Sequence, residues 1–172
     1  ADAMVTGGTR HHAATIEKLN KVVESRPGEI IFGLTMLVSK GRTVFVSDTN
    51  VHDNPTAEQL VQIAISSTRV ARLFGFDPKV AFLSHSTFGK PATERTKHVR
   101  KAIELMKTMK IDFDYDGEMQ PDVALNPEYK ESYPFSKIVG SANILIMPAL
   151  HSASISVKLM KTFGGAKLIG PL

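Results

Sequence analysis

The chain has 172 residues, of which 42% are hydrophobic and 22% charged, and this composition is typical of one globular domain. It contains no cysteine, which excludes disulfides and thiolate zinc sites. The net charge is +4, but no stacking platform of aromatic and basic residues accompanies it, so we expect no nucleic-acid partner. No apolar run reaches the roughly 20 residues of a membrane span, and no signal peptide is visible. We therefore expect a cytoplasmic protein without a membrane partner.

Strands and helices alternate along the chain. Apolar periodicity, a hairpin turn at Lys40-Gly41 and a capping box formed by Thr56 and Gln59 mark the elements. In chain order, the prediction is a strand at 1–8, a helix at 11–26, strands at 29–39 and 42–48, a helix at 56–74, a strand at 79–84, a helix at 93–110, strands at 113–119 and 142–148, and a helix at 152–165. Both ends fall close to predicted elements, so we interpret the chain as a fragment of a longer polypeptide.

The short, continuously apolar strands indicate a sheet that is buried on both faces. Such strands are usually parallel, with helices covering each face. We therefore predict an α/β fold, a layered α/β/α arrangement with a mostly parallel sheet and an antiparallel hairpin. Ligands in such folds bind beyond the carboxyl ends of the strands, which points to three loops, at 84–91, 116–122 and 148–154.

The loop at 84–91 combines hydroxyl groups with a lysine just before a helix. Hydroxyls, a cation and backbone N–H groups at a helix start can hold a phosphate-type anion. The same side chains can instead complete the hydrogen bonds of a turn and a cap, and both interpretations stay open. The spacing is not that of a P-loop, and neighbouring Ser84 and His85 would point to opposite sides of an extended segment, which argues against a serine hydrolase. The candidate ligand-binding residues are Ser84, His85, Ser86, Thr87 and Lys90.

Acidic residues gather in the second loop region, but their spacing does not fit a calcium loop. A metal site and simple helix capping are the alternatives there, and we predict no metal site. Catalytic residues stay unknown at this level. The secondary candidates for the cleft are Asp116, Glu118, Asp122, His151 and Ser154.

Four segments in this order resemble the phosphate acetyltransferase/butyryltransferase family, over essentially the whole chain. They are FVSDTNVHDNPTAEQLVQIAI at 45–65, GFDPKVAFLSHST at 75–87, DYDGEMQPDVAL at 114–125, and the stretch from SANILIMPAL to GGAKLIGPL at 141–172. The resemblance implies binding of acyl-CoA and phosphate in a cleft between two α/β domains, and acyl transfer between them. It also implies a fold similar to isocitrate and isopropylmalate dehydrogenases, with residues from about 15 to 168 forming most of the second, smaller domain and the ends belonging to the first.

The segments SHSTFG, DTNVHDNP and DGEMQPD are most similar to the version of this family that is fused behind NADP-dependent malic enzymes. In that version the region is regulatory, senses acetyl-CoA and helps to oligomerise the enzyme. The resemblance therefore implies acetyl-CoA or CoA as a ligand and a homo-oligomer. It implies no cofactor in this region, with NADP and a divalent metal only in an upstream malic domain.

Several departures from the family pattern bear on catalysis. An arginine of the first helix is replaced by Glu17, which would weaken anion binding by like-charge repulsion if it faces the cleft. The family's Pro-Asp-Leu-x-x-Gly-Asn-x-x-Tyr-Lys has Ala149, Ala153, Ser154 and Val157 at its Asp, Gly, Asn and Tyr positions. The family's later serine and arginine would follow residue 172. We therefore expect the parent polypeptide to be an enzyme and this fragment alone to be inactive. The alternatives are an active phosphate acetyltransferase and an assembly module with a relic pocket.

Overall fold

The computed structural model describes residues 12–19, 21–22, 25 and 28–172. The chain divides into two units, residues 1–31 and 32–172. In the first unit, helix α1 covers His12–Leu19, and the carboxylate of Glu17 pairs with Lys21 Nζ at 2.8 Å on an exposed surface. The predicted strand at 1–8 and parts of the predicted helix at 11–26 lie outside the described residues.

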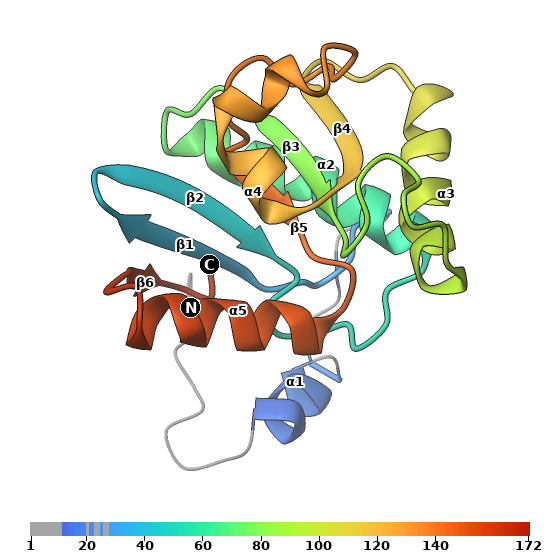
Figure 1. Ribbon diagram of the computed structural model, residues 1–172. Coiled ribbons are helices and arrows are strands. Elements are labelled where there is room, and N and C mark those ends of the chain that lie inside the picture. Colours follow the sequence, from blue (N-terminus) through green and yellow to red (C-terminus); the bar gives the residue numbers. More distant parts are fainter. Residues whose placement is uncertain (1–11, 20, 23–24, 26–27) are drawn as a thin grey trace. The chain divides into compact units, whose positions relative to one another are not determined.

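The second unit is built on a six-stranded mixed sheet with the strand order β4-β3-β5-β2-β1-β6 (Figure 1). The β2–β5, β3–β5 and β3–β4 pairings are parallel, whereas β1 pairs antiparallel with both β2 and β6. This confirms the predicted α/β fold and its hairpin. The strands are β1 Leu34–Ser39, β2 Arg42–Ser47, β3 Lys79–Leu83, β4 Asp114–Met119, β5 Ile144–Ile146 and β6 Lys167–Ile169.

Two of the predicted strand assignments need correction. The strand expected at 29–39 begins only at Leu34, because the N–H of Gly33 donates to the Asp48 carboxylate at 2.9 Å instead of to a neighbouring strand. Strand β6 was not predicted at all. It has only three residues, and it is defined by its pairing with β1 rather than by a pattern of its own.

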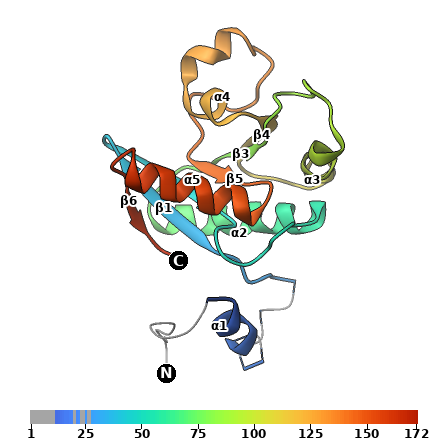
Figure 2. The same ribbon diagram turned by 60° about the horizontal axis from the view of Figure 1, so that its bottom comes forward.

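Helices cover both faces of the sheet (Figures 1 and 2). The capping box of α2 is confirmed: Thr56 Oγ1 accepts from the Gln59 N–H, and Gln59 Oε1 accepts from the Thr56 N–H. The helix predicted from residue 93 begins with a 3-10 turn, so its α-helical part starts at Lys97. The helical elements are α2 Ala57–Leu73, the 3-10 turn η1 Glu94–Thr96, α3 Lys97–Lys107, α4 Pro121–Leu125, the 3-10 turn η2 Pro127–Glu131 and α5 Leu150–Thr162. None of the described helices is long and apolar enough to cross a membrane.

Alternating residues of the central strands form two apolar layers. Towards α2, the ring of Phe45 packs against Phe74 and Phe76, and Ser47 Oγ bonds to Ser67 Oγ at 2.8 Å. Side chains of the opposite parity pack with α4 and α5 in one buried cluster, which includes Val46, Ala81, Leu83, Ala124, Leu145, Met147, Ala153 and Val157. The central strands are therefore buried on both faces, as their continuous apolar sequences predict.

A bulge in β4 redirects one acidic side chain. Phe82 of β3 lies opposite Gly117, and Leu83 lies opposite Met119, so Glu118 has no opposing residue in β3. An extra residue of this kind bends the strand locally and changes the direction of its side chain. Gly117 has φ +145°, and a Cβ at this position would lie 2.6 Å from the carbonyl oxygen of Phe82. The bulge therefore depends on glycine at position 117.

We predict that Gly117→Ala destabilises the protein by at least about 2 kcal/mol more than Gly41→Ala, as measured by urea unfolding. Both glycines have positive φ, but nothing lies within 4 Å of a Cβ at Gly41. The control variant thus carries the backbone strain alone, and the difference reports the contact with β3. Equal losses of stability in the two variants would contradict the close approach of the strands.

Candidate anion-binding site

A cavity of about 750 Å³ opens where the parallel strands β2, β3, β4 and β5 end. Each of the three predicted loops contributes lining residues to it. Of the predicted site residues, the structure brings together Ser84, His85 and His151. The lining residues are Asn54, Pro55, Leu83, Ser84, His85, His98, Pro121, Met147, Pro148, Ala149, His151, Ser152 and Ser156.

Ser84 lines the cavity. Its N–H donates to the Met119 carbonyl at 3.0 Å, and its residue is only 8% exposed. Ser86 lies two residues on and is fully buried, and its hydroxyl donates to Glu118 Oε1 at 2.9 Å. A hydroxyl has one hydrogen to donate. The 3.4 Å contact between the two serine oxygens is therefore weak, and the Ser84 hydroxyl donates no hydrogen bond to the described residues.

The buried carboxylate of Glu118 fixes the loop that follows β3. In addition to the Ser86 hydroxyl, Oε1 of this carboxylate accepts the Gly89 N–H at 2.9 Å. The backbone carbonyl of Glu118 accepts the Phe88 N–H at 2.7 Å. Arg100 Nε lies 3.7 Å from Oε2. Glu118 is 1% exposed, so these contacts replace the water that a carboxylate would otherwise bind. Glu118 is thus a loop anchor and does not line the cavity.

The tip of the same loop turns away from Ser84. Thr87 and Lys90 exchange both backbone hydrogen bonds, at 3.0 and 3.1 Å, across a two-residue turn. Phe88 and Gly89 in this turn have φ values of 47° and 87°, as in tight hairpin turns. The Phe88 ring packs edge-on against Phe135 with centroids 4.8 Å apart. Thr87 and Lys90 consequently line a separate hollow with tyrosine neighbours and not the cavity of Ser84.

The secondary candidates are dispersed over the loops. Both carboxylate oxygens of Asp116 accept backbone N–H groups, from Gly117 at 2.9 Å and from Lys137 at 2.7 Å. Asp122 accepts the N–H of the next residue at the start of α4 and lines the hollow of Lys90. Ser154 is half-buried on α5 and does not line the cavity. Among the described residues, no group of three or more His, Cys, Asp or Glu side chains could hold a metal ion.

Sequence reasoning missed several lining residues, of which His98 is the most informative. It lies in the first turn of α3, and its Nε2 donates to the carbonyl of Pro148 at 3.2 Å. The helical pattern alone gives no signal for this contact, because it depends on where α3 packs. Helix α3 is tied to α2 by Lys101, whose hydrogen bond to Glu58 at 2.9 Å lowers the pKa of Glu58 to about 2.

A second buried carboxylate positions the opposite rim of the cavity. Asp48 follows β2, is 2% exposed, and accepts the N–H groups of Asn50 and His52 at 2.7 and 2.8 Å. His52 Nδ1 lies 2.7 Å from the same carboxylate, and the Gly33 N–H at 2.9 Å ties it to the segment before β1. Asp48 therefore caps backbone N–H groups of the segment that follows β2. It also fixes the start of the segment that brings Asn54 and Pro55 to the cavity.

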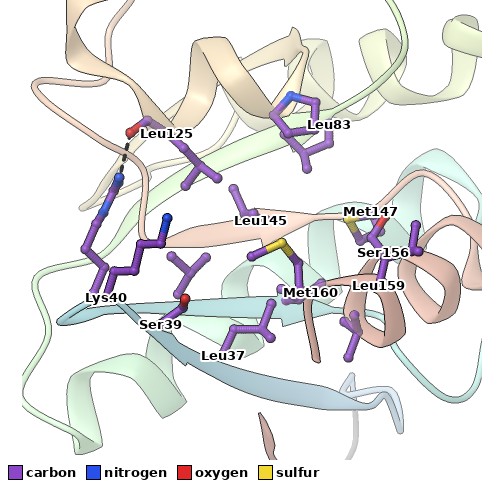
Figure 3. A pocket seen from close by; sticks show the side chains of 15 residues that line it. Leu37, Ser39, Lys40, Leu83, Leu125, Leu145, Met147, Ser156, Leu159 and Met160 are labelled. Atoms are coloured by element: carbon purple, nitrogen blue, oxygen red, sulfur yellow. Dashed lines mark hydrogen bonds between the residues drawn. The ribbon is translucent and has the colours of Figure 1, made fainter. Parts of the chain in front are cut away.

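A different cavity, of about 460 Å³, lies between the sheet and α5 and is lined almost entirely by apolar side chains (Figure 3). Leu37, Leu145, Leu159 and Met160 are among them. Its polar groups come mainly from the hairpin, where Arg42 donates to the Leu125 carbonyl at 2.8 Å. An apolar lining of this kind suits hydrophobic contact with another surface and not the binding of phosphate.

The fold and the cavity define the class of protein first: it is an α/β domain with a polar cavity at the carboxyl edge of its parallel strands. A family model described as phosphate acetyl/butaryl transferase matches residues 1–172, and the chain belongs to this family.

Two curated relatives and one solved structure are similar to this chain over nearly its whole length, but the chain covers only part of each of them. The chain is 46% identical to an NADP-dependent malic enzyme of Rhizobium meliloti, over 100% of this chain and 23% of that protein. It is 34% identical to a phosphate acetyltransferase of Clostridium acetobutylicum, over 99% of this chain and 54% of that protein. A phosphotransacetylase structure from Streptococcus pyogenes superposes with a TM-score of 0.90 at 31% identity, covering 100% of this chain and 54% of that one. The chain thus spans about a quarter of the malic enzyme and half of the transferases.

We predict that Glu118→Ala costs about 3 kcal/mol of stability, because it leaves the buried Ser86 hydroxyl and the part-buried Gly89 N–H without their acceptor and Arg100 without its ion-pair partner. Glu94→Ala is the matched control, since Glu94 also pairs with a cation of α3 but its side chain is 84% exposed. The control should lose less than about 0.5 kcal/mol. Urea unfolding of both variants tests the pair, and a loss for Glu118→Ala as small as that of the control would contradict the anchoring role.

Proposed function

We propose that this chain is the phosphotransacetylase-like domain of an NADP-dependent malic enzyme, in which it binds acetyl-CoA and phosphate-type ligands and regulates the enzyme. The observation that carries the proposal is the cavity of about 750 Å³ at the strand ends, which is lined by Ser84 and by the first residues of α5. The N–H groups in the first turn of a helix have no partners within the helix and favour a negative charge. The likeness to malic enzymes supports the assignment to that branch.

A regulatory role agrees with the lining of the cavity. Ala149, the N-cap of α5, gives the cavity no side-chain acceptor, and Val157 of the same helix lines the apolar cavity instead. Acyl transfer needs fixed charge aimed at the reacting groups. Of the described residues, those that line the polar cavity include no lysine, arginine, aspartate or glutamate. Such a lining supports reversible ligand binding better than it supports chemistry.

The proposal includes a finer description of the fold. We place the chain in the isocitrate and isopropylmalate dehydrogenase-like class, with residues from about 15 to 168 forming most of the second domain. The parallel strands and the antiparallel β1–β2 hairpin support this placement. The boundaries stay a prediction, to be tested by a structure of the full-length polypeptide.

Active phosphate acetyltransferase is the second candidate. The curated transferase relative and the TM-score of 0.90 to a phosphotransacetylase favour it. On this alternative, acetyl-CoA and phosphate would react directly while bound side by side, and the site would act by positioning them. The two candidates share a ligand class and differ in turnover.

The first prediction of the proposal is that the natural full-length polypeptide releases no CoA from acetyl-CoA in the presence of phosphate. Acetyl-CoA should instead change its rate of malate oxidation. CoA release can be followed with a thiol reagent, and the 172 residues of this chain add no thiol background because they contain no cysteine. Phosphate-dependent CoA release at an enzymatic rate would establish the transferase and refute the regulatory assignment.

We also propose that the domain self-associates through α5. Three exposed side chains of α5 and its C-cap, Ile155, Leu159 and Phe163, follow one another at intervals of four residues and are 58%, 60% and 96% exposed. Residues four apart share one face of a helix, so they form a continuous apolar stripe. This stripe adjoins the cavity of Figure 3 through Leu159. Homo-oligomers mostly form through symmetric, apolar surfaces of this kind, so a second copy of the chain is the proposed partner.

We predict that Leu159→Lys weakens self-association at least about 30-fold, because it places a charge in the centre of the apolar stripe. Leu73→Lys is the matched control, since Leu73 is a leucine of α2 that is 86% exposed and lies outside the stripe. Sedimentation equilibrium of both variants measures the effect. An unchanged oligomer in Leu159→Lys would show that α5 is not the interface.

A further inference from the structure

The titratable side chains that line the polar cavity are three histidines, among the residues that the structure describes. They come from three different elements: His85 follows β3, His98 is in α3, and His151 is in the first turn of α5. No other lining residue carries a charge. The ability of this cavity to hold an anion therefore depends on groups that are cationic at one pH and neutral at another.

The permanent cations near the cavity have partners elsewhere. On α3, Lys97 pairs with Glu94 at 2.6 Å, and Lys101 pairs with Glu58 at 2.9 Å. Arg100 Nε lies 3.7 Å from the carboxylate of Glu118, under the loop that follows β3. None of these side chains lines the cavity. Of the described residues that line the cavity, the three histidines are therefore the ones that can carry a positive charge.

Two acids, Asp53 and Asp122, adjoin lining residues of the cavity in sequence. The carbonyl of Asp53 accepts the N–H of Leu150 at 3.1 Å, which places Asp53 beside the start of α5 and near His151. Asp122 lies at the start of α4, where its side chain accepts the N–H of Val123 at 3.0 Å. Neither carboxylate lines the cavity, so neither occupies the space that an anion would take.

The three histidine rings make few hydrogen bonds within the described part of the chain. His98 donates its Nε2 hydrogen to the Pro148 carbonyl, so its Nδ1 is the ring nitrogen that keeps a free lone pair in this tautomer. The side chains of His85 and His151 have no hydrogen-bond partner among the described residues. The Ser84 hydroxyl adds a neutral donor that is 8% exposed as a residue and leaves its hydrogen available.

We infer that His85, His98 and His151 supply the positive charge with which this domain holds its anion, and that the occupancy of the cavity by phosphate-type ligands is therefore coupled to proton uptake. The inference rests on the proposed function, because it assumes that the cavity is the site for these ligands. It makes the domain a joint sensor of its ligand and of pH. Ligand binding draws protons onto the rings, and lowering the pH tightens binding.

Isothermal titration of the natural full-length polypeptide with sulfate, inorganic phosphate and acetyl-CoA, at about pH 6 and about pH 8, tests the inference. Sulfate is the decisive probe because its charge does not change between these values. We expect sulfate to bind about tenfold more tightly at the lower pH, from the attraction between an anion and the imidazolium groups close to it. The variant H85Q/H98Q/H151Q should lose this difference, and H151Q alone should lose about a third of it on a logarithmic scale.

Lys97→Gln is the matched control, because it removes one exposed positive charge next to His98 in sequence without altering the lining of the cavity. It should keep the pH dependence of sulfate binding. The variant H151Q changes only one exposed ring, so it still tests the inference if the triple variant fails to fold.

Two failures are distinguishable. Sulfate or acetyl-CoA binding with the same affinity at both pH values, or an unchanged pH dependence in H151Q and the triple variant, overturns the role of the histidines and leaves the proposed function standing. The absence of binding of all three probes at both pH values overturns the proposed function, and the inference with it.

Discussion

The buried carboxylate of Glu118 is the interaction on which the geometry of the cavity depends. A charge that is 1% exposed loses nearly all of its hydration, and it is tolerated only because two donors at 2.9 Å and a guanidinium at 3.7 Å replace the water. The bulge in β4 provides this placement, and the bulge in turn requires glycine at position 117. A local irregularity of one strand thus determines the path of the loop that follows the neighbouring strand, and with it the position of Ser84.

Asp48 performs the equivalent task after β2, where it gathers backbone N–H groups around a carboxylate that is 2% exposed. The two acids hold opposite rims of one cavity, yet neither lines it. Their carboxylates accept hydrogen bonds from the loops, and these bonds hold the loops in place around the cavity. The polar residues of this sheet edge therefore fall into two groups, buried acids that shape the loops and neutral or titratable groups that face the ligand space.

The sequence predicted the architecture well because the relevant signals are local. Continuous apolar strands, the turn at Lys40-Gly41 and the capping box at Thr56 each depend on a few neighbouring residues. The meeting of three loops also followed, since parallel strands place their carboxyl ends at one edge. The different roles of the residues within each loop could not be predicted from the sequence. Ser84 and Ser86 look equivalent in the sequence, but the bulge turns Glu118 towards one of them and leaves the other to the cavity. His98 was missed because its contact with Pro148 depends on the packing of α3 and not on its own neighbours.

The chemistry of the cavity has a consequence for the proposed regulatory role. A transferase gains from permanent charge near the reacting groups, because such charge stabilises the transition state without having to be assembled first. A sensor gains from the opposite property, since its occupancy must respond to conditions and must remain reversible. A cavity whose titratable lining residues are all histidines, within the described part of the chain, has charge that varies with pH and is absent when the rings are neutral. On the proposed function, the site thus keeps the shape of an anion-binding cleft, held by Glu118 and Asp48, while the strength of binding is left to vary with the protonation of three side chains.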